Sequence, residues 1–117
     1  MTRKRPIVIV EPDPAWATQF QEMAVVLKAA LGSLALAVEH VGSTSVPGLP
    51  AKPIIDIDVV IESPEQLPDV VEALAAVGYR HEGDIGIPGR EAFILDGAEA
   101  PNDGTGRHWP RHHLYVC

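Results

Sequence analysis

The spacing of hydrophobic residues along the chain predicts two helices. In the first, large apolar side chains recur every three or four positions and share one helical face: Trp16, Phe20, Met23, Ala24, Leu27 and Leu31. Asp13 and Pro14 are typical of a helix start, and Gly32 of a helix end. A second apolar stripe follows Ser63-Pro64 and stops at Gly78. Its members are Leu67, Val70, Val71, Leu74 and Val77.

Runs of β-branched and apolar residues predict the strands. The two longest runs cover residues 34–41 and 54–61, on either side of a glycine turn and a proline-rich segment. Shorter runs predict three later strands, at residues 79–82, 91–95 and 112–116. Residues 7–10 fit a strand or an extended lead-in, and residues 96–110 a long mobile loop. This order is typical of an α+β fold, a mixed sheet with helices mainly on one face.

Composition narrows the class of protein. With 117 residues, 46% of them hydrophobic and 21% charged, residues 1–117 fit a single globular domain with a frayed basic tail over residues 1–6. The net charge of −7 argues against a general nucleic-acid-binding surface, which needs clustered Lys and Arg. The single cysteine, Cys117, excludes an intrachain disulfide, so we expect a reducing, cytoplasmic setting. No run approaches the roughly 20 apolar residues of a membrane span.

Two carboxylates distinguish the strand predicted at residues 54–61. Side chains alternate between faces along a strand, so Asp56 and Asp58 share one face, and Ile55, Ile57 and Val59 share the other. Like charges held this close repel each other, and a bound cation is the simplest remedy. Oxygen ligands favour Mg²⁺ or Mn²⁺. The alternative is an edge strand whose polar face meets water.

A turn of small residues, Gly42-Ser43-Thr44-Ser45, lies upstream of these carboxylates. Such residues are common in ordinary turns, so the turn alone indicates little. Its position just before the paired acids makes it a candidate part of the same site. Three prolines between the turn and the strand, Pro47, Pro50 and Pro53, predict a rigid, extended connection.

A family resemblance rests on residues 40–57, His-Val-Gly-Ser-Thr-Ser-Val-Pro-Gly-Leu-Pro-Ala-Lys-Pro-Ile-Ile-Asp-Ile, which resemble the central motif of the GrpB-like family. Gly42-Ser43 followed by Asp56-Ile57-Asp58 resembles the signature of the nucleotidyltransferase superfamily, the polymerase-β-like fold. The resemblance covers residues 10–116 and includes a late histidine-containing strand, in which Tyr115 stands where a second histidine is expected. Family members continue into a further helical segment, so we expect a shortened homologue or a fragment.

The resemblance implies a scaffold for nucleotidyl transfer. Mg²⁺ or Mn²⁺ would bind Asp56 and Asp58, and attack on the α-phosphate of a nucleoside triphosphate would release pyrophosphate. The expected catalytic residues are Asp56, Asp58 and His113. Backbone N–H groups of the turn and nearby cations suit phosphate oxygens. The expected nucleotide-binding residues are Gly42, Ser43, Thr44, Ser45, Lys52, Arg90 and Arg111.

Polymerase-type sites usually use a third carboxylate, whose identity the sequence leaves open. Glu39 and Glu91 are candidates, and His113 would take that position if its strand lies beside residues 54–61. His40 is the other histidine expected to act near the carboxylates. His112 and His113 would point to opposite faces of a strand, which argues against a zinc site built from the late histidines.

The leading hypothesis is therefore a magnesium-dependent nucleotidyltransferase that moves a nucleoside monophosphate from a triphosphate to an unknown acceptor. A second hypothesis is a non-catalytic nucleotide- or metal-binding module with the same fold. A third is a hydrolase that uses the histidines and aspartates, which would tolerate Asp58→Asn and fail with His113→Ala. The oligomeric state stays open, a homo-oligomer included.

Overall fold

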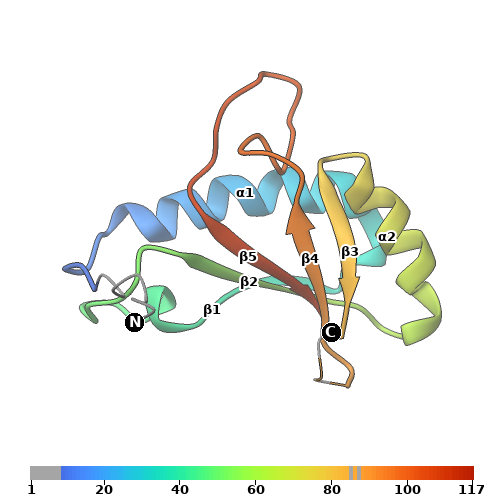
Figure 1. The fold of residues 1–117 in the computed structure, drawn as a ribbon, viewed down its shortest axis with the longest axis horizontal. Coiled ribbons are helices and arrows are strands. Elements are labelled where there is room, and N and C mark those ends of the chain that lie inside the picture. Colours follow the sequence, from blue (N-terminus) through green and yellow to red (C-terminus); the bar gives the residue numbers. More distant parts are fainter. Residues whose placement is uncertain (1–8, 85, 87) are drawn as a thin grey trace, which may run out of the picture.

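The fold is built on a five-stranded sheet in the order β1-β2-β5-β4-β3. The computed structural model describes residues 9–84, 86 and 88–117. The strands are β1 (Ala37–Val41), β2 (Ile55–Val60), β3 (Tyr79–Gly83), β4 (Glu91–Leu95) and β5 (His112–Val116). β2 and β5 are parallel and the other neighbours antiparallel, so the sheet is mixed. The strands turn from nearly horizontal at β2 to nearly vertical at β3 in Figure 1, the usual twist of a sheet.

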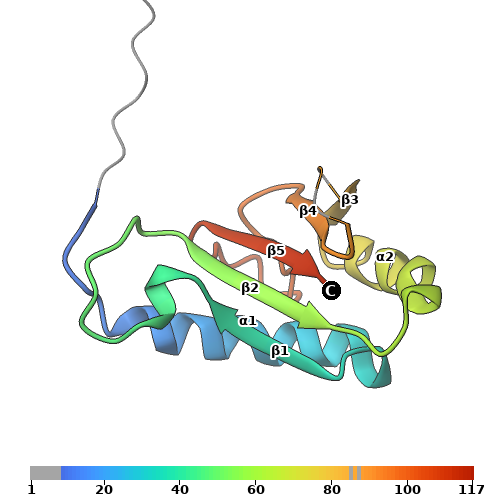
Figure 2. The same ribbon diagram turned by 90° about the horizontal axis from the view of Figure 1, so that it is seen from below.

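Two α-helices, α1 (Ala15–Leu31) and α2 (Leu67–Ala75), cover one face of this sheet. In Figure 1 α1 passes behind the sheet, and in Figure 2 it lies along β1 and β2. All six residues of the predicted α1 stripe are buried, and they pack against alternate residues of β2 in one core. The predicted α+β class is thus confirmed. Within the described residues, no helix is long and apolar enough to cross a membrane.

The helix ends follow the local chemistry expected from the sequence. The Oδ1 atom of Asp13 accepts a hydrogen bond from the backbone N–H of Ala15 at 2.8 Å, and Gly32, with φ of 55°, follows the last residue of α1. Ser63 opens a short 3₁₀ turn, η3 (Pro64–Gln66), and forms a capping box with Gln66 before α2 begins.

The predicted strands all exist, with small shifts at their ends. The strand predicted at 34–41 begins only at Ala37, because residues 32–34 form a 3₁₀ turn after α1. The strands predicted at 91–95 and 112–116 have the observed bounds of β4 and β5. Val10 forms an isolated bridge with Ala51. Two residues of the early strand predicted over residues 7–10, Ile7 and Val8, lie outside the described residues. The tail predicted over residues 1–6 also lies outside them.

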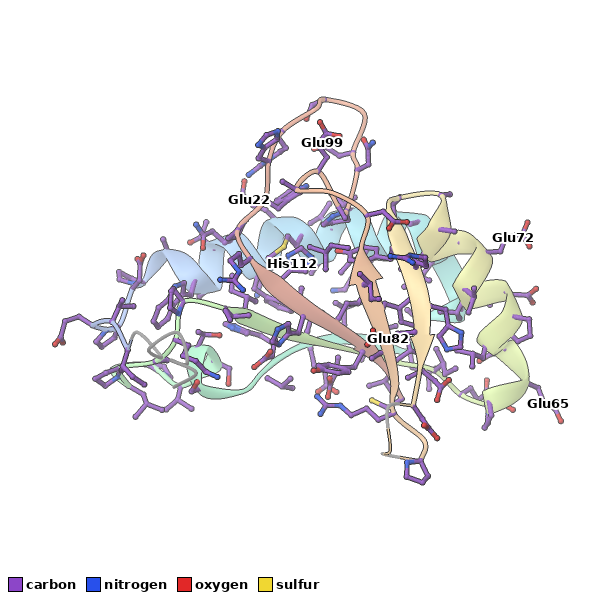
Figure 3. All side chains as sticks on the ribbon, in the orientation of Figure 1. Glu22, Glu65, Glu72, Glu82, Glu99 and His112 are labelled. Carbon is purple, nitrogen blue, oxygen red and sulfur yellow. The ribbon has the colours of Figure 1, made fainter. Side chains whose placement is uncertain are left out.

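The long loop between β4 and β5 is held to the body of the protein at several points. Trp109 is buried, and its Nε1–H donates to the carbonyl oxygen of Pro101 at 2.8 Å. The backbone N–H of Asn102 donates to the carbonyl of Val77 at 2.8 Å. Farther out, Glu99 on the loop and Glu22 on α1 mark the same end of the molecule in Figure 3. The loop is long, as predicted, but its composition did not indicate these anchors.

Candidate functional site

β2 presents two carboxylates on the face of the sheet that the helices leave open. Ile55, Ile57 and Val59 are buried, whereas Asp56 and Asp58 alternate with them and are half-buried. β2 lies between β1 and β5, so the alternative of an edge strand is wrong. The expectation that both carboxylates share a face is confirmed.

The glycine turn packs directly against the first of these carboxylates. Gly42 follows β1, whose last residue Val41 lies opposite Asp56 in the antiparallel pair. Its φ is 76° and its ψ −172°, a conformation essentially restricted to glycine. A Cβ atom built on Gly42 would overlap the Oδ2 atom of Asp56. Only glycine therefore lets the turn η2 (Ser43–Ser45) approach the carboxylate this closely.

Each carboxylate has a basic neighbour. The parallel pairing of β2 and β5 sets Asp56 beside His113, and the Nδ1 atom of His113 lies 3.0 Å from the Oδ1 atom of Asp56. The Nη2 atom of Arg90 donates to the Oδ1 atom of Asp58 at 3.1 Å. The Arg90 guanidinium also stacks on the Tyr115 ring, 3.8 Å from its centroid. The charge repulsion between the two acids is thus already relieved by protein groups.

Asp56, His113, Arg90 and Tyr115 help to line a cavity of about 190 Å³, and Asp58 lies next to it through its contact with Arg90. The other lining residues are Ser43 of the glycine turn, Lys52 of the segment after it, and Ile54. The cavity therefore joins the start of the glycine turn to Asp56 and to two cations, Lys52 and Arg90. The structure brings together five of the expected site residues here: Ser43, Lys52, Asp56, Arg90 and His113.

Three other expected residues lie elsewhere. Thr44 is buried and its hydroxyl donates to the carbonyl oxygen of Ile54 at 3.4 Å. The hydroxyl of Ser45 donates to the carbonyl oxygen of Gly42. Arg111 is exposed just before β5 and lies outside the cavity lining. The two hydroxyls hold the turn in shape, because both are engaged with the backbone.

His40 supports the turn from the helix side of the sheet. Its Nε2 atom lies 2.9 Å from the hydroxyl of Thr44, and its ring stacks on Phe20 at a centroid distance of 4.9 Å. Since that hydroxyl donates to Ile54, the Nε2 atom carries the proton and donates to Thr44. Burial lowers the pKa of His40, and the charge of Asp56 opposes this shift in part. His40 therefore acts on the site through the turn.

The two glutamates that were candidates for a third carboxylate differ in their distance from the paired acids. Glu39 pairs with Asp58 across β1 and β2, so both lie on the open face. Glu91 pairs with Val116 in the sheet and binds the Nε2 atom of His81 at 2.8 Å, away from the paired acids. His113 takes the neighbouring position on the parallel strand, as expected if β5 lies beside β2. Among the described residues, no three acids, histidines or cysteines are grouped closely enough to hold a metal together.

His112 belongs to the core instead. It points to the opposite face from His113, as the alternation predicts, and Figure 3 labels it on β5. Its Nδ1–H donates to the carbonyl of Pro110 at 2.8 Å, so its Nε2 atom accepts from the hydroxyl of Tyr79 at 2.7 Å. Burial lowers the pKa of His112 and raises the pKa of Tyr79. These shifts mark a buried structural pair.

The residues present fit a hard divalent cation. Asp56 and Asp58 offer carboxylate oxygens from one strand face, and Gly42 at the start of the glycine turn lies against Asp56. Mg²⁺ is commonly held by one or two carboxylates, with water and substrate phosphates completing its octahedron. A set of only two acids is therefore sufficient for a cation that arrives with a phosphate ligand.

No pattern in the sequence indicated the contacts of Arg90 with Asp58 and Tyr115. Arg90 is 32 residues from Asp58 along the chain, and the two meet only because β5 lies between β2 and β4. Arg90 was a candidate for phosphate contact on charge alone. No local pattern encodes the strand order that brings it to this carboxylate.

Comparison with known proteins identifies relatives of this chain. A family model described as GrpB protein matches residues 6–117. The crystal structure of conserved protein GrpB from Enterococcus faecalis is similar, with a TM-score of 0.72 and 37% sequence identity. That match covers 93% of this chain and 60% of the other.

Two curated relatives extend the comparison. UPF0157 protein PA4798 from Pseudomonas aeruginosa is 38% identical over 111 residues, which are 94% of this chain and 43% of that protein. Dephospho-CoA kinase from Mycolicibacterium paratuberculosis is 46% identical over 79 residues, which are 65% of this chain and 19% of that protein. The chain thus spans less than half of the length of either relative.

Proposed function

This chain belongs to the GrpB family, and we propose that it is a metal-dependent nucleotidyltransferase. The observation that supports this most strongly is the contact between the glycine turn and Asp56, beside Asp58 on the same strand face. A phosphate held by the turn would lie next to the carboxylates, which is where a bridging cation is useful. The substrates are a nucleoside triphosphate and an acceptor of unknown identity.

The residues in and beside the cavity have different roles in this proposal. Asp56 and Asp58 hold Mg²⁺ or Mn²⁺, which when bound neutralises phosphate charge and polarises the reacting phosphorus. The backbone N–H groups at Gly42 and Ser43 bind phosphate oxygens, because glycine permits close approach. Lys52 and Arg90 line the same cavity and supply positive charge to the triphosphate. Arg111, exposed outside the cavity, has no role here.

His113 is proposed to accept the proton of the acceptor. Its Nδ1–H donates to Asp56, which leaves the lone pair on Nε2. A second cavity of about 310 Å³ shares His113 and Tyr115 with the first and extends over β4. An acceptor bound there would meet His113 first. Its oxygen or nitrogen would form a bond to the α-phosphorus while the bond to the bridging oxygen breaks and pyrophosphate leaves.

A kinase reaction is not proposed. The name of the mycobacterial relative describes a protein of which this chain spans only a small part. Within these 117 residues there is no G-x-x-x-x-G-K-[S/T] sequence, the phosphate-binding loop of many ATP-dependent kinases. The glycine turn is followed by prolines and by the paired acids instead.

The second candidate function is a non-catalytic nucleotide-binding module. It is favoured by the partners of both acids, Arg90 and His113, which already bind the two carboxylates without a metal. A module of this kind would bind a triphosphate in the cavity and release no product.

The test is transfer of label from each of the four α-labelled nucleoside triphosphates, with Mg²⁺ or Mn²⁺ and a small-molecule and RNA extract as acceptor source. We expect pyrophosphate release and a labelled product with the wild type and neither with Asp58→Asn. The hydrolase hypothesis requires the opposite, activity in Asp58→Asn and none in His113→Ala. Nucleotide binding without a labelled product would favour the binding module.

A further inference from the structure

We propose that Arg90 is a displaceable counter-ion: it occupies Asp58 in the free protein and transfers to the triphosphate when metal and nucleotide bind together. This inference rests on the proposed function and concerns how the site selects its ligands. The free protein would then bind neither metal alone nor triphosphate alone with full affinity. Metal alone must compete with Arg90 for Asp58, and triphosphate alone must compete with Asp58 for Arg90.

The contacts of Arg90 show what it blocks. Its Nη2 atom donates to the Oδ1 atom of Asp58 at 3.1 Å, so that oxygen is engaged by a guanidinium. A divalent cation at Asp58 needs a free carboxylate oxygen and is repelled by an adjacent positive charge. Arg90 is therefore a competitor of the cation at this position as long as the ion pair persists.

The same contacts show that the competitor is easily moved. The Arg90 side chain is 34% exposed and that of Asp58 20%, so water weakens the attraction between them. A single hydrogen bond joins them, whereas arginine binds phosphate or carboxylate most strongly through two parallel bonds. A triphosphate offers better geometry for the guanidinium than Asp58 does.

The position of Arg90 also places its guanidinium near the proposed triphosphate, which is the alternative partner to Asp58. Arg90 lines the same cavity as Ser43 and Lys52, where the proposed phosphates lie. The guanidinium rests on the Tyr115 ring, 3.8 Å from its centroid. The arginine side chain has several rotatable bonds, so the guanidinium can turn from Asp58 toward the cavity while the rest of the side chain stays in place. Arg90 can thus change partner without leaving the cavity wall.

The two basic partners of the acids, His113 and Arg90, differ in how easily each can leave its carboxylate. His113 lies directly beside Asp56 on the neighbouring strand, in the register of the sheet, and its short side chain keeps it close to that carboxylate. Arg90 precedes β4 and reaches Asp58 through a long side chain. The exchange is therefore expected at Asp58 and not at Asp56.

The consequence is positive coupling between metal and triphosphate. In the wild type, α,β-methylene-ATP strengthens Mn²⁺ binding by two routes, through its phosphate ligands and by drawing Arg90 away from Asp58. Arg90→Gln removes the second route, because Asp58 is then free from the start.

The experiment measures bound Mn²⁺ by electron paramagnetic resonance for wild type, Arg90→Gln and Arg80→Gln, each with and without α,β-methylene-ATP. Arg80→Gln is the matched control, because Arg80 forms an exposed ion pair with Asp96 on the edge strand β3, two strands away from β5. Without nucleotide, we expect Arg90→Gln to bind Mn²⁺ about two- to fivefold more tightly than the other two proteins, the scale of one partly exposed ion pair. The gain in Mn²⁺ affinity on adding the analogue should be smallest in Arg90→Gln.

Equal Mn²⁺ affinity in all three proteins, or weaker binding in Arg90→Gln, overturns the role of Arg90 and leaves the proposed metal site standing. Absence of Mn²⁺ binding in all three, even with the analogue, overturns the proposed function as well. Circular dichroism of Arg90→Gln separates either result from a loss of folding.

Discussion

At the scale of single residues, the site depends on a glycine that has no room for a side chain. Gly42 combines a positive φ with direct contact to Asp56, whereas Gly48 has nearly the same φ, 78°, and open space around it. The pair thus compares a positive-φ glycine that lies against a carboxylate with one that has open space around it.

Gly48→Ala should lower the free energy of unfolding by about 1–2 kcal/mol, the cost of a left-handed conformation for an L-residue. Gly42→Ala should cost about 1–3 kcal/mol more, because the new Cβ overlaps Asp56 and forces it or the turn to move. Urea denaturation measures both. Equal losses in the two variants would mean that the turn is not packed on the carboxylate.

A second residue-scale prediction concerns the buried pair of Tyr79 and His112. Tyr79→Phe leaves the Nε2 atom of His112 without its hydrogen-bond donor and should cost about 1–3 kcal/mol of unfolding free energy. Tyr115→Phe is the same chemical change on the open face and should cost less than about 0.5 kcal/mol. Urea unfolding of both variants checks this, and equal costs would contradict it.

The pH dependence of stability follows from the buried histidines. Burial lowers the pKa of both His40 and His112 below the ordinary histidine value of about 6.5. In the range just below that value the unfolded chain binds more protons than the folded one, so stability falls as the pH falls. We expect less unfolding free energy at pH 5.5 than at pH 7.5, and a shallower decline in His112→Gln. An unchanged slope in that variant would contradict a neutral buried His112.

At the scale of secondary-structure elements, the face pattern of β2 was predictable and its partners were not. Alternation of acids with isoleucine and valine is a local signal, so Asp56 and Asp58 could be assigned to one face from six residues. The approach of Gly42 to Asp56 follows from the pairing of β1 with β2. Strand order across the whole sheet is a property of tertiary packing. The Arg90 contact was therefore missed, and the place of His113 was predicted only conditionally.

The ion pair between β2 and the start of β4 changes an expectation about stability. From the sequence, Asp58→Asn removes charge repulsion and leaves stability unchanged or improved. With Arg90 as its partner, Asp58→Asn should instead lower the unfolding free energy by up to about 1 kcal/mol, the usual size for a partly exposed pair. Asp96→Asn, which breaks the more exposed pair with Arg80, is the control and should cost less. A gain in stability in Asp58→Asn would contradict this account and restore repulsion as the dominant effect.

At the scale of the whole molecule, the division of the sheet into two faces explains where a site can form. The helices cover one face and bury its apolar residues, so the polar residues of β2 and β5 remain accessible on the other (Figures 1 and 2). The glycine turn borders this open face beside Asp56. The fold thus gathers a turn, one acid, a histidine and two cations around one cavity, with Asp58 next to it on the same strand face as Asp56.

The most direct test of this account is the melting temperature of the wild type and of Asp56→Asn/Asp58→Asn with a nucleoside triphosphate, with and without Mg²⁺. The account predicts that Mg²⁺ and triphosphate together stabilise the wild type, by about 2.7 kcal/mol at a ligand concentration of 100 times Kd. The double variant should fold and show no such combined effect. Equal stabilisation of both proteins, or of the wild type without Mg²⁺, would contradict a metal–nucleotide site on these carboxylates.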